Sequence, residues 1–199
     1  QAVSEYAVSL IGTLALPRKY KIGFSVVDNE GHANYKDLGF LAKENGKFDV
    51  YAGGGIGGGS AFGVLVDENV DPNEVLHHVE GMLHLYHELG DFKNRGKARS
   101  RFIAQRLGEE EFRKAYHEYL EKSKAAHDLT LSVAPYEVKK AGTTTPTTAL
   151  AKPQKQKGLY YIQYKPLVGT PPMDVCVKLF DYVGGLEETE FRICGDESV

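Results

Sequence analysis

The segment LPRKYK, residues 16–21, carries three cationic side chains within four positions, Arg18, Lys19 and Lys21. In an extended strand Lys19 and Lys21 project to the same face, and two neighbouring ammonium groups repel each other unless solvent or an anion separates them. In an enclosed site such a pair would bind a small dianion and supply protons to it. A solvated strand face is the other interpretation that this spacing allows.

A second basic segment, KNRGKARSRF at residues 93–102, contains no acidic residue. On a helix Lys97 and Arg101 share one face, and Arg99 and Arg106 lie on another. Guanidinium groups match the geometry of carboxylates and phosphates. The segment is therefore consistent with a solvated face, with a polycarboxylate or phosphate ligand, or with nucleic acid. The net charge of −3 and the lack of interleaved aromatic residues argue against nucleic acid.

The glycine-rich segment YAGGGIGGGSAFG, residues 51–63, satisfies the letter of G-x-G-x-x-G at Gly53, Gly55 and Gly58. A dinucleotide loop needs a helix that begins inside the motif. Here β-forming residues follow, and the next helix start is at residue 71, so we reject dinucleotide binding. The segment is then either a turning loop at a strand end or a place where backbone approaches a large flat ligand, with free N–H groups that can meet carboxylates.

Two further sets of residues could bind a metal but lack the required pattern. A polar helix face carries His77, Glu80, His84 and Glu88 without an H-E-x-x-H motif, and the opposite face is apolar, so we expect the His/Glu face to be solvated and no metal to bind. Cys176 and Cys194 lie 18 residues apart without zinc or iron–sulfur spacing, which favours buried structural cysteines.

The elements that must position these segments follow from hydrophobic periodicity and turn residues. Asn45-Gly46 favours a tight hairpin between two strands. Asp71-Pro72 is typical of a helix start, with Glu74 placed to complete a capping box. The expected elements are a helix at 3–14, strands at 19–27, 36–43, 47–54 and 61–70, and helices at 72–89, 97–107 and 109–125.

The chain divides where apolar periodicity stops. Residues 139–157 are rich in Thr, Lys, Pro and Gln and read as a linker between residues 1–138 and residues 158–199. The last part has an expected strand, helix and strand, which is the opening of a ferredoxin-like βαβ unit.

Composition excludes several classes of protein. The chain has 199 residues, 42% of them hydrophobic, which is enough for a real core. No apolar run reaches ~18 residues, so we expect no membrane span, and no signal peptide is visible. Two cysteines make no disulfide framework and favour a reduced, cytoplasmic setting. Both ends read as interrupted elements, which predicts a fragment of a longer protein.

Three motifs in order, LPRKYK, GKFDVYAGGGIGG and LYHELGDFKNRGKARSRFIAQRLG, resemble the sirohaem-containing nitrite/sulfite reductases. The resemblance spans residues 1 to about 136, and residues 158–199 are similar to the start of the second ferredoxin-like repeat of that family. It implies an α+β (α/β) fold: a half-domain of the sirohaem/4Fe-4S type with a mixed sheet and flanking helices, followed by a partial repeat. It also implies sirohaem and a [4Fe–4S] cluster at the centre of the whole protein.

The resemblance also implies roles for individual residues. Lys19 and Lys21 match the lysines that face the iron and help to bind and protonate the substrate oxyanion, with Tyr20 in place of the usual Phe. The residues implied to contact sirohaem are Arg18, Gly53, Gly54, Gly55, Asn94, Arg95, Lys97, Arg99 and Arg101. We therefore expect Lys19, Lys21, Gly54 and Arg99 to surround one concavity.

One departure from the family is decisive for activity. The four cysteines of the family, C-x5-C and C-x3-C, which hold the cluster, are absent. The implied function is part of an assimilatory-type nitrite or sulfite reductase, with sulfite or nitrite as substrate and ferredoxin or a flavoprotein as electron donor. The isolated chain is expected to be inactive. The alternatives are an anion- or nucleic-acid-binding module that uses residues 93–101, and a structural repeat without a ligand.

Overall fold

The computed structural model describes residues 1–134, 145–154, 156–186, 189–192 and 198. The chain forms two compact units, Gln1–Val133 and Ala134–Val199, and each is described by itself. No helix within the described ranges is long and apolar enough to cross a bilayer.

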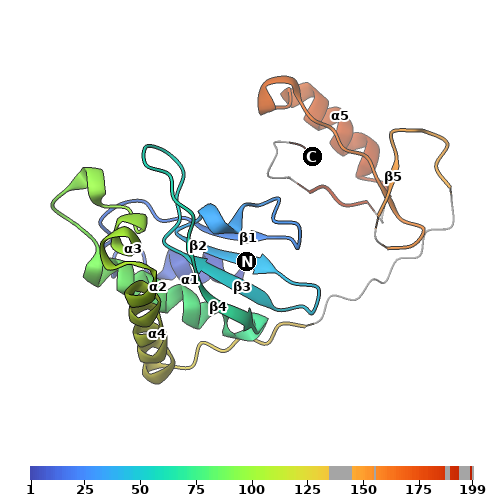
Figure 1. Ribbon diagram of the computed structural model, residues 1–199. Coiled ribbons are helices and arrows are strands. Elements are labelled where there is room, and N and C mark those ends of the chain that lie inside the picture. Colours follow the sequence, from blue (N-terminus) through green and yellow to red (C-terminus); the bar gives the residue numbers. More distant parts are fainter. Residues whose placement is uncertain (135–144, 155, 187–188, 193–197, 199) are drawn as a thin grey trace. The chain divides into compact units, whose positions relative to one another are not determined.

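The first unit is built on a four-stranded mixed sheet in the order β1-β2-β3-β4 (Figure 1). Strands β2 and β3 form the expected hairpin, and Gly46 in its turn has a φ of +79°. β4 continues the sheet antiparallel to β3, and β1 pairs parallel to β2 at the edge. The strands are β1 (Ile22–Ser25), β2 (Leu38–Ala42), β3 (Phe48–Ala52) and β4 (Val64–Val70).

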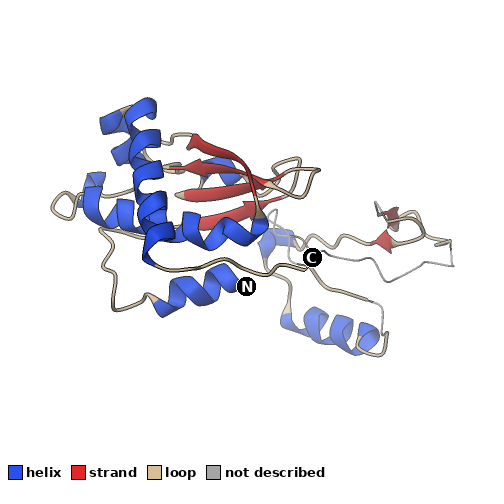
Figure 2. Ribbon diagram, turned by 90° about the horizontal axis from the view of Figure 1, so that it is seen from below, coloured by secondary structure: helices blue, strands red, loops and turns tan. Residues whose placement is uncertain are grey.

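Helices cover one face of this sheet (Figures 1 and 2). Alternate residues of β2, β3 and β4, such as Phe40, Val50 and Val66, pack against α2, α3 and α4 in a single core. Burying each such side chain contributes about 1.5–3 kcal/mol. The helices are α1 (Ala2–Ser9), α2 (Val75–Leu89), α3 (Arg101–Leu107) and α4 (Glu109–Ala126), with short 3-10 turns at Ala33–Tyr35, Pro72–Glu74 and Arg95–Lys97.

The N-terminal elements are shorter than the sequence predicts. Helix α1 ends at Ser9, and turns at residues 10–13 replace its expected last residues. Strand β1 begins only at Ile22, so Lys19 and Lys21 lie in the irregular segment before the strand. Strand geometry therefore does not align these two side chains as predicted, and another contact must position them.

The second unit contains a two-residue hairpin and one long helix. β5 (Lys152–Pro153) pairs antiparallel to β6 (Tyr160–Tyr161), so part of the expected linker is a strand. A 3-10 turn (Leu167–Gly169) and α5 (Met173–Val183) follow. The second strand was expected at residues 188–194; residues 189–192 carry no strand, and residues 188, 193 and 194, which include Cys194, lie outside the described residues. The βαβ unit is not formed within the part that the structure describes.

Candidate functional site

The three motifs meet at Asp37, a residue that the sequence analysis did not single out. Its carboxylate is fully buried. Oδ2 accepts hydrogen bonds from the backbone N–H of Lys21 at 2.9 Å and from Arg99 Nη2 at 2.7 Å. Oδ1 accepts from the hydroxyl of Ser100, and the carbonyl of Asp37 accepts from Gly53 N at 2.9 Å. One aspartate thus joins the lysine, arginine and glycine segments.

The first glycine triplet is explained largely by contacts inside the chain. A Cβ on Gly54 would lie 2.7 Å from the carbonyl oxygen of Lys36 and 2.8 Å from that of Asn34. Gly53 has a φ of +74°, and its Cβ would lie 3.1 Å from Phe112. All three glycines of the triplet are buried. The fold itself requires glycine at positions 53 and 54, whatever their role toward a ligand.

The rest of the glycine segment is a narrow hairpin that extends beyond β3 and β4 (Figure 1). Gly55 and Ala61 exchange two backbone hydrogen bonds of 3.0 Å, and residues 56–60 at the tip are exposed. Arg101 Nη2 donates to the carbonyl of Gly58 at 2.7 Å, which fastens this tip to the start of α3. The Nε of Arg101 is buried and has no hydrogen-bond partner among the described residues.

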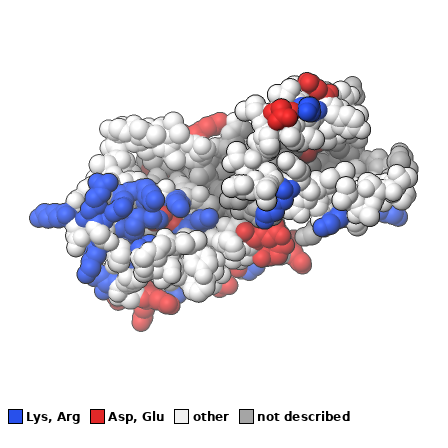
Figure 3. Space-filling model, turned by 90° about the horizontal axis from the view of Figure 1, so that it is seen from above, with Lys and Arg blue, Asp and Glu red and all other residues white. Residues whose placement is uncertain are grey.

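Several cationic side chains belong to the segments that meet at this junction. Lys19 and Lys21 are exposed, and neither ammonium group has an ion-pair or hydrogen-bond partner within the described ranges. Arg18 Nη1 donates to the carbonyl of Arg95 at 2.5 Å, which places the two basic segments side by side. Figure 3 shows Lys and Arg side chains gathered at one end of the first unit. This surface favours an anionic ligand.

Two predicted ligand contacts are engaged elsewhere. Arg99 is 9% exposed and uses its guanidinium on Asp37. The side chain of Asn94 accepts from Gly96 N at 3.1 Å and caps the 3-10 turn that begins at Arg95. In their present positions both side chains build the scaffold, and their roles toward sirohaem remain predictions.

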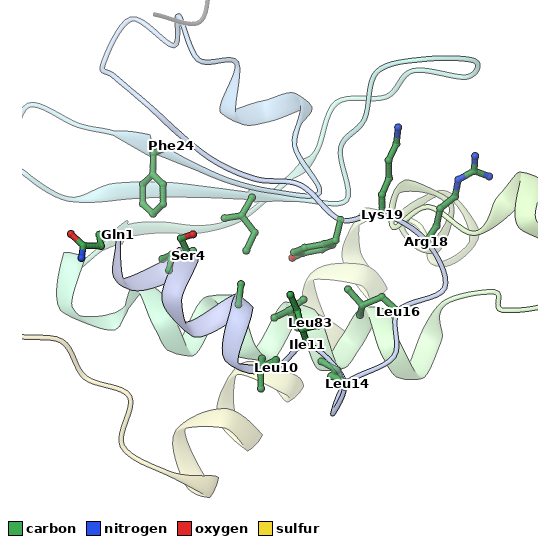
Figure 4. Close-up of a pocket in the computed structure, with 14 residues that line it drawn as sticks. Gln1, Ser4, Leu10, Ile11, Leu14, Leu16, Arg18, Lys19, Phe24 and Leu83 are labelled. Atoms are coloured by element: carbon green, nitrogen blue, oxygen red, sulfur yellow. The ribbon is translucent and has the colours of Figure 1, made fainter. Parts of the chain in front are cut away.

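A groove of about 560 Å³ lies between α1 and the edge strand β1 (Figure 4). Apolar side chains line most of it, and the side chains of Arg18 and Lys19 extend from one end. Of the four residues expected around one concavity, only Lys19 lines this groove. Lys21 and Arg99 both donate to Asp37, and Gly54 N donates to the carbonyl of Lys36, but none of these three residues lines the groove.

Tyr20, between the two lysines, packs inward. Its ring stacks on Tyr86 with centroids 5.5 Å apart, and Tyr86 Oη donates to the carbonyl of Ala98 at 2.7 Å. Burial raises the pKa of Tyr20 well above its usual value, and its hydroxyl is buried without a hydrogen-bond partner in the described part of the chain. Lys19 and Lys21 therefore flank a side chain that anchors their segment in the core.

The prediction of a solvated His/Glu face on α2 is wrong for His77 and Glu80, which are 4% and 3% exposed. Glu80 accepts hydrogen bonds from Tyr6 of α1 at 2.8 Å, from His127 at 2.5 Å and from Ser123 of α4. Burial raises the pKa of Glu80, but these hydrogen bonds outweigh it and hold the pKa below its usual value of 4.5. The face is buried because α1 and α4 cover it.

A [4Fe–4S] cluster does not fit the residues of this chain. Such clusters are held by four cysteine thiolates, and the sequence has two cysteines. Cys176 is half-buried in α5. Within the described ranges, no group of three or more His, Cys, Asp or Glu residues could hold a metal ion.

Comparison with known proteins places this arrangement in a family. Residues 5–124 match the family described as nitrite and sulphite reductase 4Fe-4S domain. Over 114 residues the chain is 34% identical to the sulfite reductase (NADPH) hemoprotein beta-component of Acidithiobacillus ferrooxidans. This match covers 52% of this chain and 20% of that relative.

The solved structure of the NirA protein of Mycobacterium tuberculosis shares the fold, with a TM-score of 0.71 at 23% identity. The match covers 99% of this chain and 36% of NirA. The chain thus spans about a third of the length of NirA and about a fifth of the length of the hemoprotein beta-component. Since the family match extends over more than half of its residues, the chain belongs to the nitrite and sulphite reductase 4Fe-4S domain family.

Proposed function

We propose that this chain supplies part of the sirohaem and oxyanion site of an assimilatory-type nitrite or sulfite reductase. The observation that carries the proposal is the junction at Asp37, which joins the lysine, glycine and arginine segments at one end of the first unit. Lys19 and Lys21 belong to the segment that this junction holds, and their exposed ammonium groups have no partner among the described residues. Membership of the reductase family supports the substrate class.

Each group at the junction has a definite task in this proposal. Lys19 and Lys21 bind the oxyanion and donate protons from their Nζ atoms as oxygen leaves as water. Arg18, Arg95 and Lys97 offset the carboxylate charges of sirohaem at the exposed surface. Among the cations proposed to contact sirohaem carboxylates, Arg101 is the best candidate, since its buried Nε has no partner in the described residues and can donate to a carboxylate.

When bound, sirohaem would supply an iron that binds the substrate and would pass on to it electrons that come from the donor. The four cysteines that hold the cluster in this family are absent from the sequence, and we assign the cluster and the contact with a ferredoxin or flavoprotein donor to the whole reductase only. The chain alone is accordingly inactive, and we place the protein in the cytoplasm. The alternative of a nucleic-acid-binding module receives no support from the family match.

The test is a titration of the chain with sirohaem, followed by the absorption of the tetrapyrrole and by quenching of tyrosine fluorescence. We expect binding, and we expect the double variant K19A/K21A to weaken it. The control K47A/K114A removes the same charge from two exposed lysines outside the lysine, glycine and arginine segments, one in the β2–β3 turn and one on α4. With reduced viologen as electron source, sulfite and nitrite should not turn over.

Two results would count against the proposal. The sirohaem assignment would be lost if the unmodified chain did not bind, or if both double variants weakened binding equally. Turnover of sulfite or nitrite by the chain would refute its inactivity.

A further inference from the structure

The segment of Lys19 and Lys21 lacks the support that a strand would give it. Both residues precede β1, and neither is among the residues of β1 that pair with β2. The segment is held instead at the backbone of Lys21. Its N–H donates to Asp37 Oδ2 at 2.9 Å, and its carbonyl accepts from Leu38 N at 3.2 Å. Lys21 is thus fixed on both sides by two consecutive residues, Asp37 and Leu38.

Asp37 has no hydrogen-bonding capacity to spare for other partners. Oδ2 accepts from Lys21 N and Arg99 Nη2, and Oδ1 accepts from the Ser100 hydroxyl and from Arg99 Nε at 3.4 Å. The charge of Arg99, which is 9% exposed, offsets the buried carboxylate. An isosteric amide would offer one oxygen in place of two, and its NH2 group would face a donor.

We propose that Asp37 is a positioning residue for the reaction, because its carboxylate sets the backbone at Lys21 and so the place of both ammonium groups relative to the glycine and arginine segments. The inference rests on the proposed role of the two lysines in binding the oxyanion. Asp37 itself is buried and touches no substrate.

The variant D37N distinguishes positioning from simple electrostatics. Replacing a carboxylate by an amide removes a negative charge near the lysines, and by Coulomb attraction alone this would strengthen the binding of an anion. Loss of position predicts the opposite sign. We expect D37N to bind sulfite about tenfold more weakly, which corresponds to about 1.4 kcal/mol.

The experiment is an NMR titration of the isotope-labelled 199-residue chain with sulfite at constant ionic strength, followed at the Lys19 and Lys21 side chains. S100A is the matched control, since it removes a hydrogen bond to Oδ1 of the same carboxylate and leaves the Lys21 bond to Oδ2 in place. We expect S100A to lose stability but to bind sulfite as the unmodified chain does.

Amide hydrogen exchange gives a second readout that does not depend on D37N folding. In the unmodified chain the amide of Lys21 should be protected from exchange to the same degree as the amide of Leu38, although Lys21 lies outside the strands. A Lys21 amide that exchanges at the rate of an open loop would overturn the inference.

The outcomes separate the two proposals. If the unmodified chain does not bind sulfite, the proposed function fails and this inference fails with it. If the unmodified chain binds sulfite and folded D37N binds it equally well or better, the positioning role fails alone. Weaker binding by D37N with unchanged binding by S100A supports both.

Discussion

Replacing Gly54 by alanine tests whether the fold itself or a bound ligand requires the glycine triplet. The end of β3 passes close to the turn before β2, and Gly54 N donates to the carbonyl of Lys36 at 2.9 Å. A parallel contact joins Gly63 N to the carbonyl of Asn34 at 2.7 Å. A Cβ on Gly54 would meet both carbonyl oxygens and would lie 3.0 Å from Gly63 N. All three atoms are backbone, so no side chain can rotate away.

The size of the effect follows from these contacts. Separating the two backbone segments weakens both hydrogen bonds, each with a net contribution of about 0.5–1.5 kcal/mol. Overpacking destabilises the folded state by about 1–3 kcal/mol more. Alanine also lowers the entropy of the unfolded chain, which stabilises the folded state by about 0.4–1 kcal/mol. We therefore expect G54A to lower the free energy of unfolding by about 2–4 kcal/mol.

The assay is urea unfolding followed by far-UV circular dichroism, because the signal comes mainly from the first unit. Its helices α2 and α4 hold 15 and 18 residues, whereas α5 of the second unit holds 11. G58A is the matched control, since a Cβ there would meet nothing within 4 Å, and we expect a change within about 0.5 kcal/mol. If G54A unfolded at the same urea concentration as the unmodified chain, the fold would not need this glycine, and a ligand would remain the only explanation.

Three further changes test the packing around the site, each by the free energy of unfolding. Y20F should raise it by about 1 kcal/mol, since the variant removes a buried hydroxyl without a partner among the described residues; a loss of stability would show that the hydroxyl is bonded in solution. R99A should lower it by about 3–5 kcal/mol because Asp37 would be left buried and unpaired, while R95A, at an exposed guanidinium, should change it by less than about 0.5 kcal/mol; equal effects would contradict the buried pair. E80Q should lower it by about 1–3 kcal/mol at neutral pH. The folded carboxyl of Glu80 has a pKa below 4.5, so this difference should shrink as the pH falls below 4.5 through the folded pKa, and a difference independent of pH would refute the charged network.

Much of the sheet and its hairpin could be predicted from sequence because the signals there are local. The strand-like segments KDLGFLAK and KFDVYAGG predicted β2 and β3, and Asn45-Gly46 predicted the turn between them. The signal for the helical turn that leads into α2 was also local, since the side chain of Asp71 accepts from Asn73 N at 2.9 Å and caps the 3-10 turn Pro72–Glu74, although α2 itself begins only at Val75. The capping box was not confirmed, because the carboxylate of Glu74 pairs with Lys124 of α4 at 3.5 Å instead.

The buried face of α2 could not be derived from polarity alone. His77 and Glu80 are polar, but α1 and α4 supply hydrogen-bonding partners that only the tertiary structure brings together. One sequence signal was available at Gly81, in the middle of the helix. A Cβ there would lie 3.0 Å from the backbone of Leu120. A glycine at this position indicates a close helix neighbour on the face that was expected to be solvated.

The basic motifs divide into cations that build the scaffold and cations left for a ligand. Arg99 is committed to Asp37, and Arg101 holds the glycine hairpin with one nitrogen while its Nε is unpartnered in the described residues. The side-chain ammonium groups of Lys19 and Lys21 have no ion-pair or hydrogen-bond partner there either. Counting positive charges along the sequence therefore overstates the number available to an anion, because a buried guanidinium that is already paired adds little to binding. The sequence could not show that the carboxylate of Asp37 makes this division. An aspartate before a strand resembles an ordinary turn residue, and only the tertiary structure brings Arg99, Ser100 and the backbone of Lys21 to it as hydrogen-bond donors.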